Sequence, residues 1–274
     1  MDTSNKASSF DEGLTAQMRG DFSSAIEIFE RVLETHPTSA AAYHHMGRCY
    51  VRLGEFDRAI ECLETAVRLG PNRIPARLDA GMLYLYMREI AKAKVQFLRA
   101  LALDSSNVKA MSGLGMVHYH EKDLGKAISL FQDACALNPS HFACHYYLAR
   151  IHHALKNPAG VQEEARHSAA ICQDLIRTRP EQPEGYFFLA ETFMVLEDYR
   201  MALQNYLIAK DFAADGVMHF FAFGLHYTLV GNYLGIAACY TMLGEHRYAR
   251  YFGELTLQLD SGNEEAKRFA AIEG

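Results

Sequence analysis

Residues 40–73 read AAAYHHMGRCYVRLGEFDRAIECLETAVRLGPNR, and residues 74–107 read IPARLDAGMLYLYMREIAKAKVQFLRALALDSSN. When the two segments are aligned, Gly47 falls on Gly81, a step of 34 residues. Apolar residues recur in each segment at helical spacing, in two bursts that are separated by a polar turn such as residues 53–57. Each segment therefore predicts a helix-turn-helix hairpin, and the constant step predicts a repeat protein.

The same step continues along much of the chain. Five rows of residues share one register: Gly13, Gly47, Gly81, Gly115 and Ala149; Ala25, Ala59, Ala93 and Ala127; Phe29, Leu63, Phe97 and Phe131; Val32, Ala66, Ala100 and Ala134; Pro37, Pro71, Ser105 and Pro139. Small residues let paired helices approach closely, aromatic residues fill the space between hairpins, and proline ends the second helix. The rows predict hairpins that stack on one another in sequence order.

This pattern resembles the tetratricopeptide repeat family, in which an aromatic residue, Leu-Gly, Tyr, Ala, Phe, Ala and Pro follow in that order. The second repeat carries the match in Tyr43, Met46-Gly47, Tyr50, Ala59, Leu63, Ala66 and Pro71. The resemblance implies an all-α fold, a right-handed superhelical solenoid of antiparallel helix hairpins with about seven repeats and a C-terminal capping helix.

We expect residues 1–274 to form a single solenoid domain. The expected repeats cover approximately residues 6–39, 40–73, 74–107, 108–141, 142–182, 183–214 and 230–261, and the cap covers 262–274. The fifth repeat holds seven extra residues, about two helical turns, which should lengthen its hairpin around Pro158 to Ala165. Residues 217–229 predict either an additional helix or an extension of the following one. In the last repeat, Gly253 departs from the aromatic row.

The composition narrows the function. A formal net charge of −6 leaves no excess of basic residues for a phosphate backbone, so we expect no nucleic-acid partner. The first residues show neither a basic region nor an apolar core of a signal peptide, which predicts a cytoplasmic protein. Residues 216–244 carry no charge and are long enough to span a bilayer, but three internal glycines, two histidines and Asn232 favour burial in the solenoid. We expect any membrane association to be indirect.

The family resemblance implies that the first helix of each repeat lines a concave surface through its positions 2, 5, 9, 12 and 13. The candidate peptide-binding residues are then His44, Arg48, Arg52, Leu78, Met82, Leu85, Tyr86, Met116, Tyr119, His120, Tyr146, Arg150, His153, Phe187 and Met194. Exposed apolar stripes that include Arg and aromatic residues are typical of partner sites, although a tightly coiled solenoid could bury the stripe in its own wall. Arginine pairs with carboxylates, so the set predicts a protein or peptide partner with apolar and acidic residues.

Catalytic and metal sites are not expected. The chain has no phosphate-binding glycine loop, G-x-S-x-G or H-E-x-x-H sequence, and we expect no enzyme activity and no cofactor. Several of the 13 histidines lie in the fourth and fifth repeats, but His118, His145 and His152 replace ring-shaped packing residues of the repeat, which favours packing over metal binding. Glu163 and Glu164 are adjacent in sequence and should face solvent.

Two functions fit these observations. The first is a cytoplasmic adaptor or assembly scaffold that binds a partner segment in the concave surface. The second is a structural scaffold that self-assembles as a homo-oligomer through the apolar residues 216–244.

Overall fold

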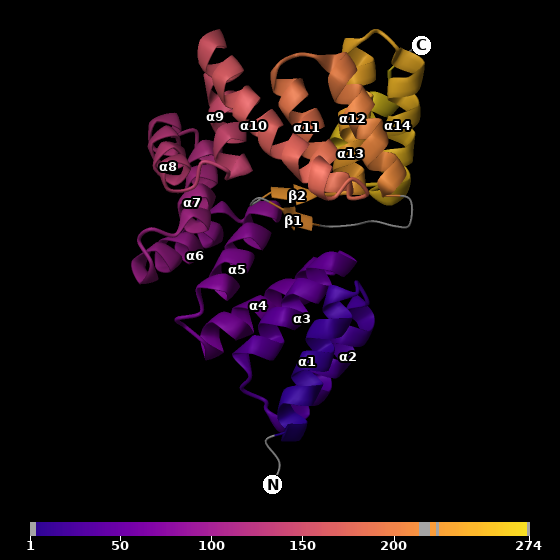
Figure 1. The fold of residues 1–274 in the computed structure, drawn as a ribbon. Coiled ribbons are helices and arrows are strands. Elements are labelled where there is room, and N and C mark those ends of the chain that lie inside the picture. Colours follow the sequence, from indigo (N-terminus) through magenta and orange to yellow (C-terminus); the bar gives the residue numbers. More distant parts are fainter. Residues whose placement is uncertain (1–3, 214–219, 223–224, 273–274) are drawn as a thin grey trace. The chain divides into compact units, whose positions relative to one another are not determined.

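The computed structural model describes residues 4–213, 220–222 and 225–272. Two compact units make up the chain, Met1–Leu130 and Phe131–Gly274 (Figure 1). Their helices confirm the prediction of an all-α fold built from consecutive helix hairpins. The prediction that both units form one continuous solenoid domain stays a prediction.

The first unit consists of helices that pack on their neighbours in sequence. They are α1 (Ser4–Met18), α2 (Phe22–Thr35), α3 (Ala40–Leu53), α4 (Phe56–Leu69), α5 (Ile74–Tyr86), α6 (Ile90–Leu103) and α7 (Val108–His120). Helix α1 packs on α2, α3 on α4 and α5 on α6, and α2, α4 and α6 each contact the first helix of the next hairpin. The boundary between the two units falls within α8 (Leu124–Leu137).

The second unit continues the same pattern and adds a short hairpin of strands. Its elements are α9 (Phe142–Ala154), α10 (Pro158–Thr178), α11 (Pro183–Val195), α12 (Tyr199–Phe212), β1 (Phe220–Ala222), β2 (Leu225–Tyr227), α13 (Leu229–Met242), α14 (His246–Leu259) and α15 (Glu264–Ala270). Each helix from α9 to α15 contacts the next helix along the chain. The predicted capping helix is confirmed as α15, which Asn263 caps by accepting a hydrogen bond from the Ala266 amide at 3.0 Å.

A left-handed residue follows the first helix of every repeat. In three turns it is glycine, including Gly54 at φ 76°, and in four it is a residue with a side chain, including Lys122, Lys156 and Glu197 at φ 64°, 55° and 58°. Glycine adopts this conformation without steric cost, whereas other residues are slightly strained in it. The turn therefore has the same backbone geometry in every repeat while its side chain varies.

The predicted rows of small and aromatic residues meet within a hairpin as well as between hairpins, since the Phe97 ring lies against both Gly81 of its own hairpin and Gly113 of the next. Ala93, Phe97 and Ala100 on α6 are fully buried. A Cβ atom at Gly81 of α5 would lie 2.8 Å from the Phe97 ring, closer than van der Waals contact allows. Only glycine therefore lets α5 and α6 approach this closely around the ring.

The seven extra residues of the fifth repeat lengthen its second helix, as the sequence predicts. Helix α10 has 21 residues, whereas its counterpart α12 has 14. Val161, Ala165, Ser168 and Cys172 are its buried residues, and they keep the three- and four-residue spacing along the whole helix. Since seven residues are about two turns, α10 grows longer without rotating its buried face.

The helix predicted for residues 217–229 is wrong in the two segments that the structure describes before Thr228. Phe220–Ala222 and Leu225–Tyr227 pair as antiparallel strands, with Phe221 opposite His226. Helix α13 starts only at Leu229, because the Thr228 hydroxyl caps it by accepting a hydrogen bond from the Gly231 amide at 2.9 Å. The remaining residues of that prediction, 217–219 and 223–224, lie outside the described residues.

Packing explains why Gly253 replaces the aromatic residue of the repeat pattern. A Cβ atom at this position in α14 would lie 2.8 Å from the Ala270 amide nitrogen and 2.8 Å from the Phe269 Cβ atom of α15. The aromatic residue of the family pattern would occupy the space that α15 fills. Gly253 is therefore the residue that lets the capping helix dock.

Two side chains, Arg77 and His145, each bind the carbonyl of the loop before their helix and a side chain of the next helix. They occupy the same position of the repeat, two periods apart. In the third repeat, the buried Arg77 donates from Nε and Nη2 to the Pro71 carbonyl at 2.9 and 2.6 Å, and from Nη1 to the Gln96 side-chain oxygen at 3.1 Å. Burial lowers the pKa of Arg77, but a guanidinium stays charged at any physiological pH. We call Pro71, Arg77 and Gln96 the Arg77 clamp.

The fifth repeat builds the second clamp from histidine. His145 Nε2 lies 2.9 Å from the Pro139 carbonyl, and its Nδ1 lies 2.7 Å from the Glu164 carboxylate. Burial alone would lower the pKa of His145, but the Cys135 thiol, the Glu164 carboxylate and the Pro139 carbonyl together raise it to about 10. At neutral pH the ring is therefore an imidazolium that donates from both nitrogens. We call Pro139, His145 and Glu164 the His145 clamp, and it corrects the prediction that Glu164 faces solvent.

Candidate protein-binding surface

The structure divides the fifteen predicted binding residues by exposure. Six are buried: His44, Leu78, Leu85, Met116, Tyr146 and Phe187. Nine are half-buried or exposed: Arg48, Arg52, Met82, Tyr86, Tyr119, His120, Arg150, His153 and Met194. The buried members belong to the wall of each unit, so the accessible part of the predicted surface is smaller and more polar than the full set.

In the first unit, the candidate residues on α3 join a carboxylate on α5. His44 Nε2 lies 2.7 Å from Asp79 Oδ2, and Arg48 Nε lies 3.8 Å from the same oxygen. Arg52 stacks its guanidinium over the Phe22 ring at 4.8 Å. Both arginines thus already interact within the unit, and Arg48, with about half of its side chain exposed, is the more accessible.

In the second unit, a buried network joins α9, α11 and α12. The Tyr146 hydroxyl donates to Glu191 Oε2 at 2.5 Å, and the Tyr206 hydroxyl donates to Glu191 Oε1. Burial and the Glu191 charge raise the pKa of both tyrosines well above 10, so both hydroxyls remain donors. Arg150 Nη1 donates to the Tyr146 hydroxyl at 3.3 Å, and the guanidinium lies over the Tyr146 ring. The network fixes one face of α9 against α11.

Two pockets lie next to each other in the second unit, and the smaller one is at the ends of the first helices of its repeats. It has a volume of about 280 Å³ and is lined by His153, Met194, Glu197, Tyr199, Ala238, Thr241, Met242 and Phe269. We call it the first-helix pocket. It contains two of the predicted binding residues, His153 and Met194, and the Met194 sulfur accepts a hydrogen bond from the Cys239 thiol at 3.3 Å.

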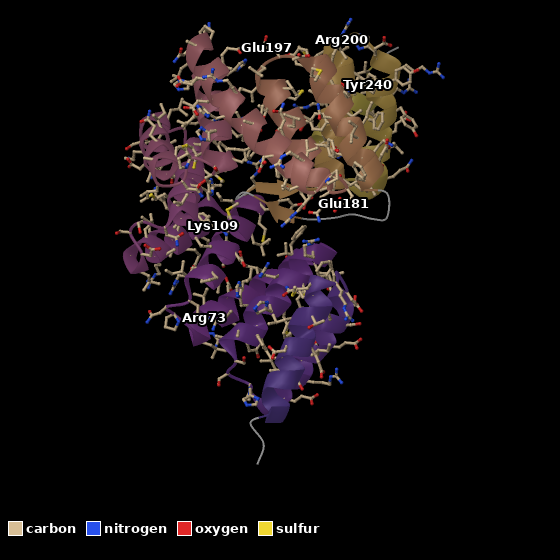
Figure 2. All side chains as sticks on the ribbon, viewed as in Figure 1. Arg73, Lys109, Glu181, Glu197, Arg200 and Tyr240 are labelled. Atoms are coloured by element: carbon tan, nitrogen blue, oxygen red, sulfur yellow. The ribbon has the colours of Figure 1, made fainter. Side chains whose placement is uncertain are left out.

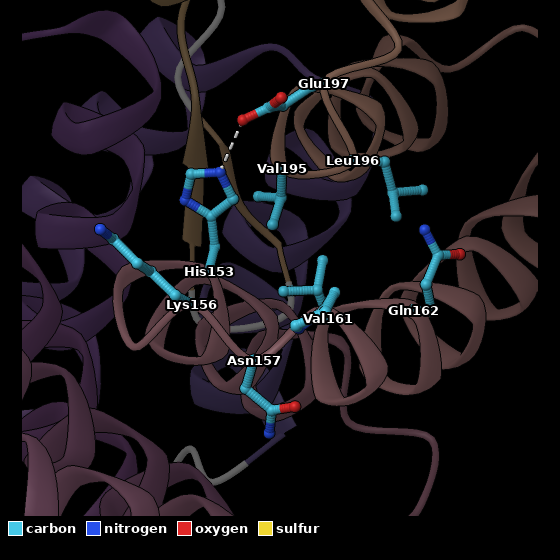
Figure 3. A pocket seen from close by; sticks show the side chains of 9 residues that line it. His153, Lys156, Asn157, Val161, Gln162, Val195, Leu196 and Glu197 are labelled. Atoms are coloured by element: carbon cyan, nitrogen blue, oxygen red, sulfur yellow. Dashed lines mark hydrogen bonds and ion pairs between the residues drawn. The ribbon is translucent and has the colours of Figure 1, made fainter.

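A larger pocket of about 520 Å³ lies next to it. Its lining residues are His153, Lys156, Asn157, Pro158, Val161, Gln162, Val195, Leu196 and Glu197 (Figure 3). We call it the insert pocket, because Pro158, Val161 and Gln162 belong to the lengthened helix α10. His153 and Glu197 line both pockets, and His153 Nε2 pairs with Glu197 Oε1 at 2.9 Å. Figure 2 shows Glu181 and Glu197 at opposite ends of α11 and so locates the end of the unit that carries both pockets.

Most residues of the insert pocket were not predicted from the sequence. Only His153 was among the predicted residues, because the family pattern points to the first helices and not to the turn or to α10. The signal that could have identified it is the seven-residue insertion itself, since a helix longer than its neighbours leaves part of its surface uncovered.

Two further observations concern alternative functions. In the described part of the chain, no three side chains of histidine, cysteine, aspartate or glutamate are arranged to hold a metal ion. None of the described helices is long and apolar enough to cross a bilayer.

Comparisons with known proteins agree with the helical architecture. Two models of the tetratricopeptide repeat match residues 16–79 and 78–141. A tetratricopeptide repeat protein from Parabacteroides merdae ATCC 43184 is similar in structure over 96% of this chain and 96% of its own, with a TM-score of 0.61 and 14% identity. No curated protein matches the sequence at a significant level.

Two other solved structures show the same fold. A chain of the APC/C hetero-tetramer Cut9-Hcn1 covers 97% of this chain with 49% of its own length, at a TM-score of 0.63 and 18% identity. The structure of MamA residues 41-end from Desulfovibrio magneticus RS-1 covers 64% of this chain with 97% of its own, at a TM-score of 0.53 and 20% identity. At these identities the likeness concerns the fold alone.

Proposed function

Since the chain is a tetratricopeptide repeat protein, matched by two models of that repeat and similar in fold to other members, we propose that it is a non-enzymatic adaptor or assembly scaffold that holds a segment of a partner protein. The repeats and the structural neighbours support a protein-interaction scaffold. The proposal adds the place of binding: the ends of α9, α11 and α13 at the first-helix pocket.

One observation carries the proposal. His153, Met194 and Thr241 line the same pocket, and they occupy the same position in three successive repeats once the extra 7 and 13 residues are subtracted from their separations of 41 and 47. A pocket that equivalent positions of consecutive repeats share is continuous across those repeats. Such a surface suits an extended chain that crosses the helices.

The side chains around the pocket indicate the chemistry of the segment. Met194, Ala238 and Met242 provide apolar surface, and Met242 as a residue is 57% exposed. Arg150 lies one turn before His153 on α9 and is half-buried. Methionine surfaces adapt to varied apolar side chains, and arginine favours carboxylates. We therefore propose a partner segment with apolar and acidic residues.

The test is a comparison of two tryptophan variants in the full chain. Ala238→Trp fills the first-helix pocket, and Gln258→Trp places the same ring on an exposed position of α14. We expect Ala238→Trp to lose a partner that the native chain and Gln258→Trp both retain in quantitative pull-downs from source-cell lysate, and circular dichroism must show that both variants fold. Retention of the same partners by Ala238→Trp would contradict the proposal.

Self-assembly is the second candidate. Helix α13 carries no charged residue, and its Leu229, Val230 and Leu234 are only half-buried. A second copy could cover this surface. Light scattering as a function of concentration distinguishes the two, because an adaptor of this kind keeps the mass of one chain and a self-assembling scaffold does not. Cytoplasmic location and the absence of a cofactor are proposed on the sequence alone.

A further inference from the structure

The insert pocket follows from the unequal lengths of three neighbouring helices. Helix α10 has 21 residues, and α9 and α11 have 13 each. At 1.5 Å per residue, α10 is about 12 Å longer than either neighbour. Helix α11 starts beside the end of α10 and runs back along it, so it ends about two turns before it reaches Pro158. The first turns of α10 therefore extend past α11, and the pocket lies there.

The centre of the pocket is apolar. Figure 3 shows Val161 and Val195 facing each other across it, with Leu196 and Gln162 on one side and Lys156 on the other. A volume of about 520 Å³ is within the range of about 300–1,000 Å³ that is common for ligand pockets. The space is large enough for a large aliphatic or aromatic side chain.

The rim carries one lysine, Lys156. Glu197 is paired with His153, and the Asn157 side chain caps α10 by accepting a hydrogen bond from the Gly160 amide at 3.2 Å. Among the described residues, no carboxylate forms an ion pair with the exposed Lys156. The charge that complements this rim is therefore a carboxylate.

We propose that the insert pocket is an anchoring subsite that receives a large apolar side chain of a partner protein segment, with an adjacent aspartate or glutamate placed against Lys156. The inference rests on the proposed function, because the two pockets share His153 and Glu197 and one segment could occupy both. An extended peptide suits two adjoining pockets better than a compact small molecule does.

The experiment starts from a library of random twelve-residue peptides displayed on phage. The full native chain selects binders, and a Gln162→Trp chain, whose indole fills the insert pocket from an exposed position, removes peptides that bind elsewhere. We expect the surviving peptides to share a large apolar residue next to an acidic one. A library that yields no such peptide would overturn the inference.

Fluorescence anisotropy with the selected peptide then compares matched variants. We expect Gln162→Trp and Lys156→Glu each to weaken binding about tenfold or more, as for a central interface contact. Gln173→Trp changes the same residue type on the same helix away from the pocket, and Lys122→Glu changes the equivalent turn residue of the preceding repeat. Both controls should bind as the native chain does. Equal losses in variants and controls would overturn the inference.

The Ala238→Trp chain separates this inference from the proposed function. If the peptide is lost only with Gln162→Trp and Lys156→Glu, the anchoring subsite holds and the first-helix pocket is not the binding place. If partners from the lysate are lost only with Ala238→Trp, the proposed function holds and the anchoring subsite fails. Light scattering of the native chain shows whether a second copy occupies the pocket instead, which would also overturn the inference.

Discussion

The Arg77 clamp and the His145 clamp solve one structural problem with different chemistry. Each places a cation at the first aromatic position of its repeat, six residues after the proline whose carbonyl it binds and 19 residues before its side-chain partner. Arg77 is permanently charged and faces the neutral Gln96, whereas His145 can lose its proton and faces the Glu164 carboxylate. The comparison teaches that repeat geometry fixes where such a polar contact can form, while the choice of cation, arginine or histidine, decides whether its strength depends on pH.

The largest effect should come from His145→Met, which introduces the residue that occupies the same position at Met111. The change leaves the half-buried Glu164 carboxylate and the Pro139 carbonyl without their donor. We expect the free energy of unfolding to fall by about 3 kcal/mol, as for the loss of one member of a buried ion pair. Urea denaturation measures it. Addition of Glu164→Leu should recover part of the loss, and no recovery would argue against the ion pair.

A rise in pH should weaken only the His145 clamp. The folded pKa of about 10 lies above the usual value of 6.5, so the stabilisation is fully present below pH 6.5 and is lost as the pH rises toward 10. The neutral ring would still donate to Pro139 but would turn a lone pair toward Glu164. We expect native stability to fall over this range, relative to the His145→Met chain, by most of the about 3 kcal/mol that the substitution costs. A constant difference from pH 6.5 to 10 would rule out the charged histidine.

Arg77→Met should cost less, about 1.5 kcal/mol, because its lost partners are a carbonyl and a neutral amide. Its effect should not change between pH 6.5 and 10. Hydrogen exchange of the peptides around residues 71–96 reports this loss locally, and the peptides around 139–164 should remain protected. Faster exchange in both regions would show that the two clamps are not independent.

The smallest change in stability should come from replacing the histidine of the His145 clamp with the arginine of the other clamp. Arg at position 145 can still donate to both Pro139 and Glu164, so His145→Arg should change stability by no more than about 0.5 kcal/mol at pH 7 and should remove the decline toward pH 10. The pH profile of urea denaturation measures both. Persistence of the decline in this variant would assign it to another titrating group.

The clamps also show how far sequence analysis reaches. The rows of small and aromatic residues predicted the hairpins, and their shift by seven residues predicted the longer fifth hairpin, because periodicity reports packing directly. The repeat pattern identified His145 as a replacement for an aromatic ring. It gave no sign that Glu164 is the partner of His145, since residues 19 apart in sequence meet only after the hairpin has formed. The docking role of Gly253 was hidden for the same reason.

The helix predicted for residues 217–229 was wrong for a different reason. An uncharged apolar run is compatible with a helix or with strands, and aromatic residues such as Phe220, Phe221 and Tyr227 favour strands. Two residues separate β1 from β2, a common length for a hairpin connection. Once the repeat register is lost, length and aromatic content are better guides than continuation of the pattern.

The length of α10 also sets the distance that a partner segment bound across α9 and α11 would have to span. Seven residues at 1.5 Å each displace the hairpins on either side of α10 by about 10 Å along its axis. An extended peptide covers that distance with about three residues. A segment that binds across α9 and α11 would therefore need a longer spacing between its anchoring side chains than one that crosses two regular repeats, and the insertion would then restrict partners by spacing as well as by side-chain type.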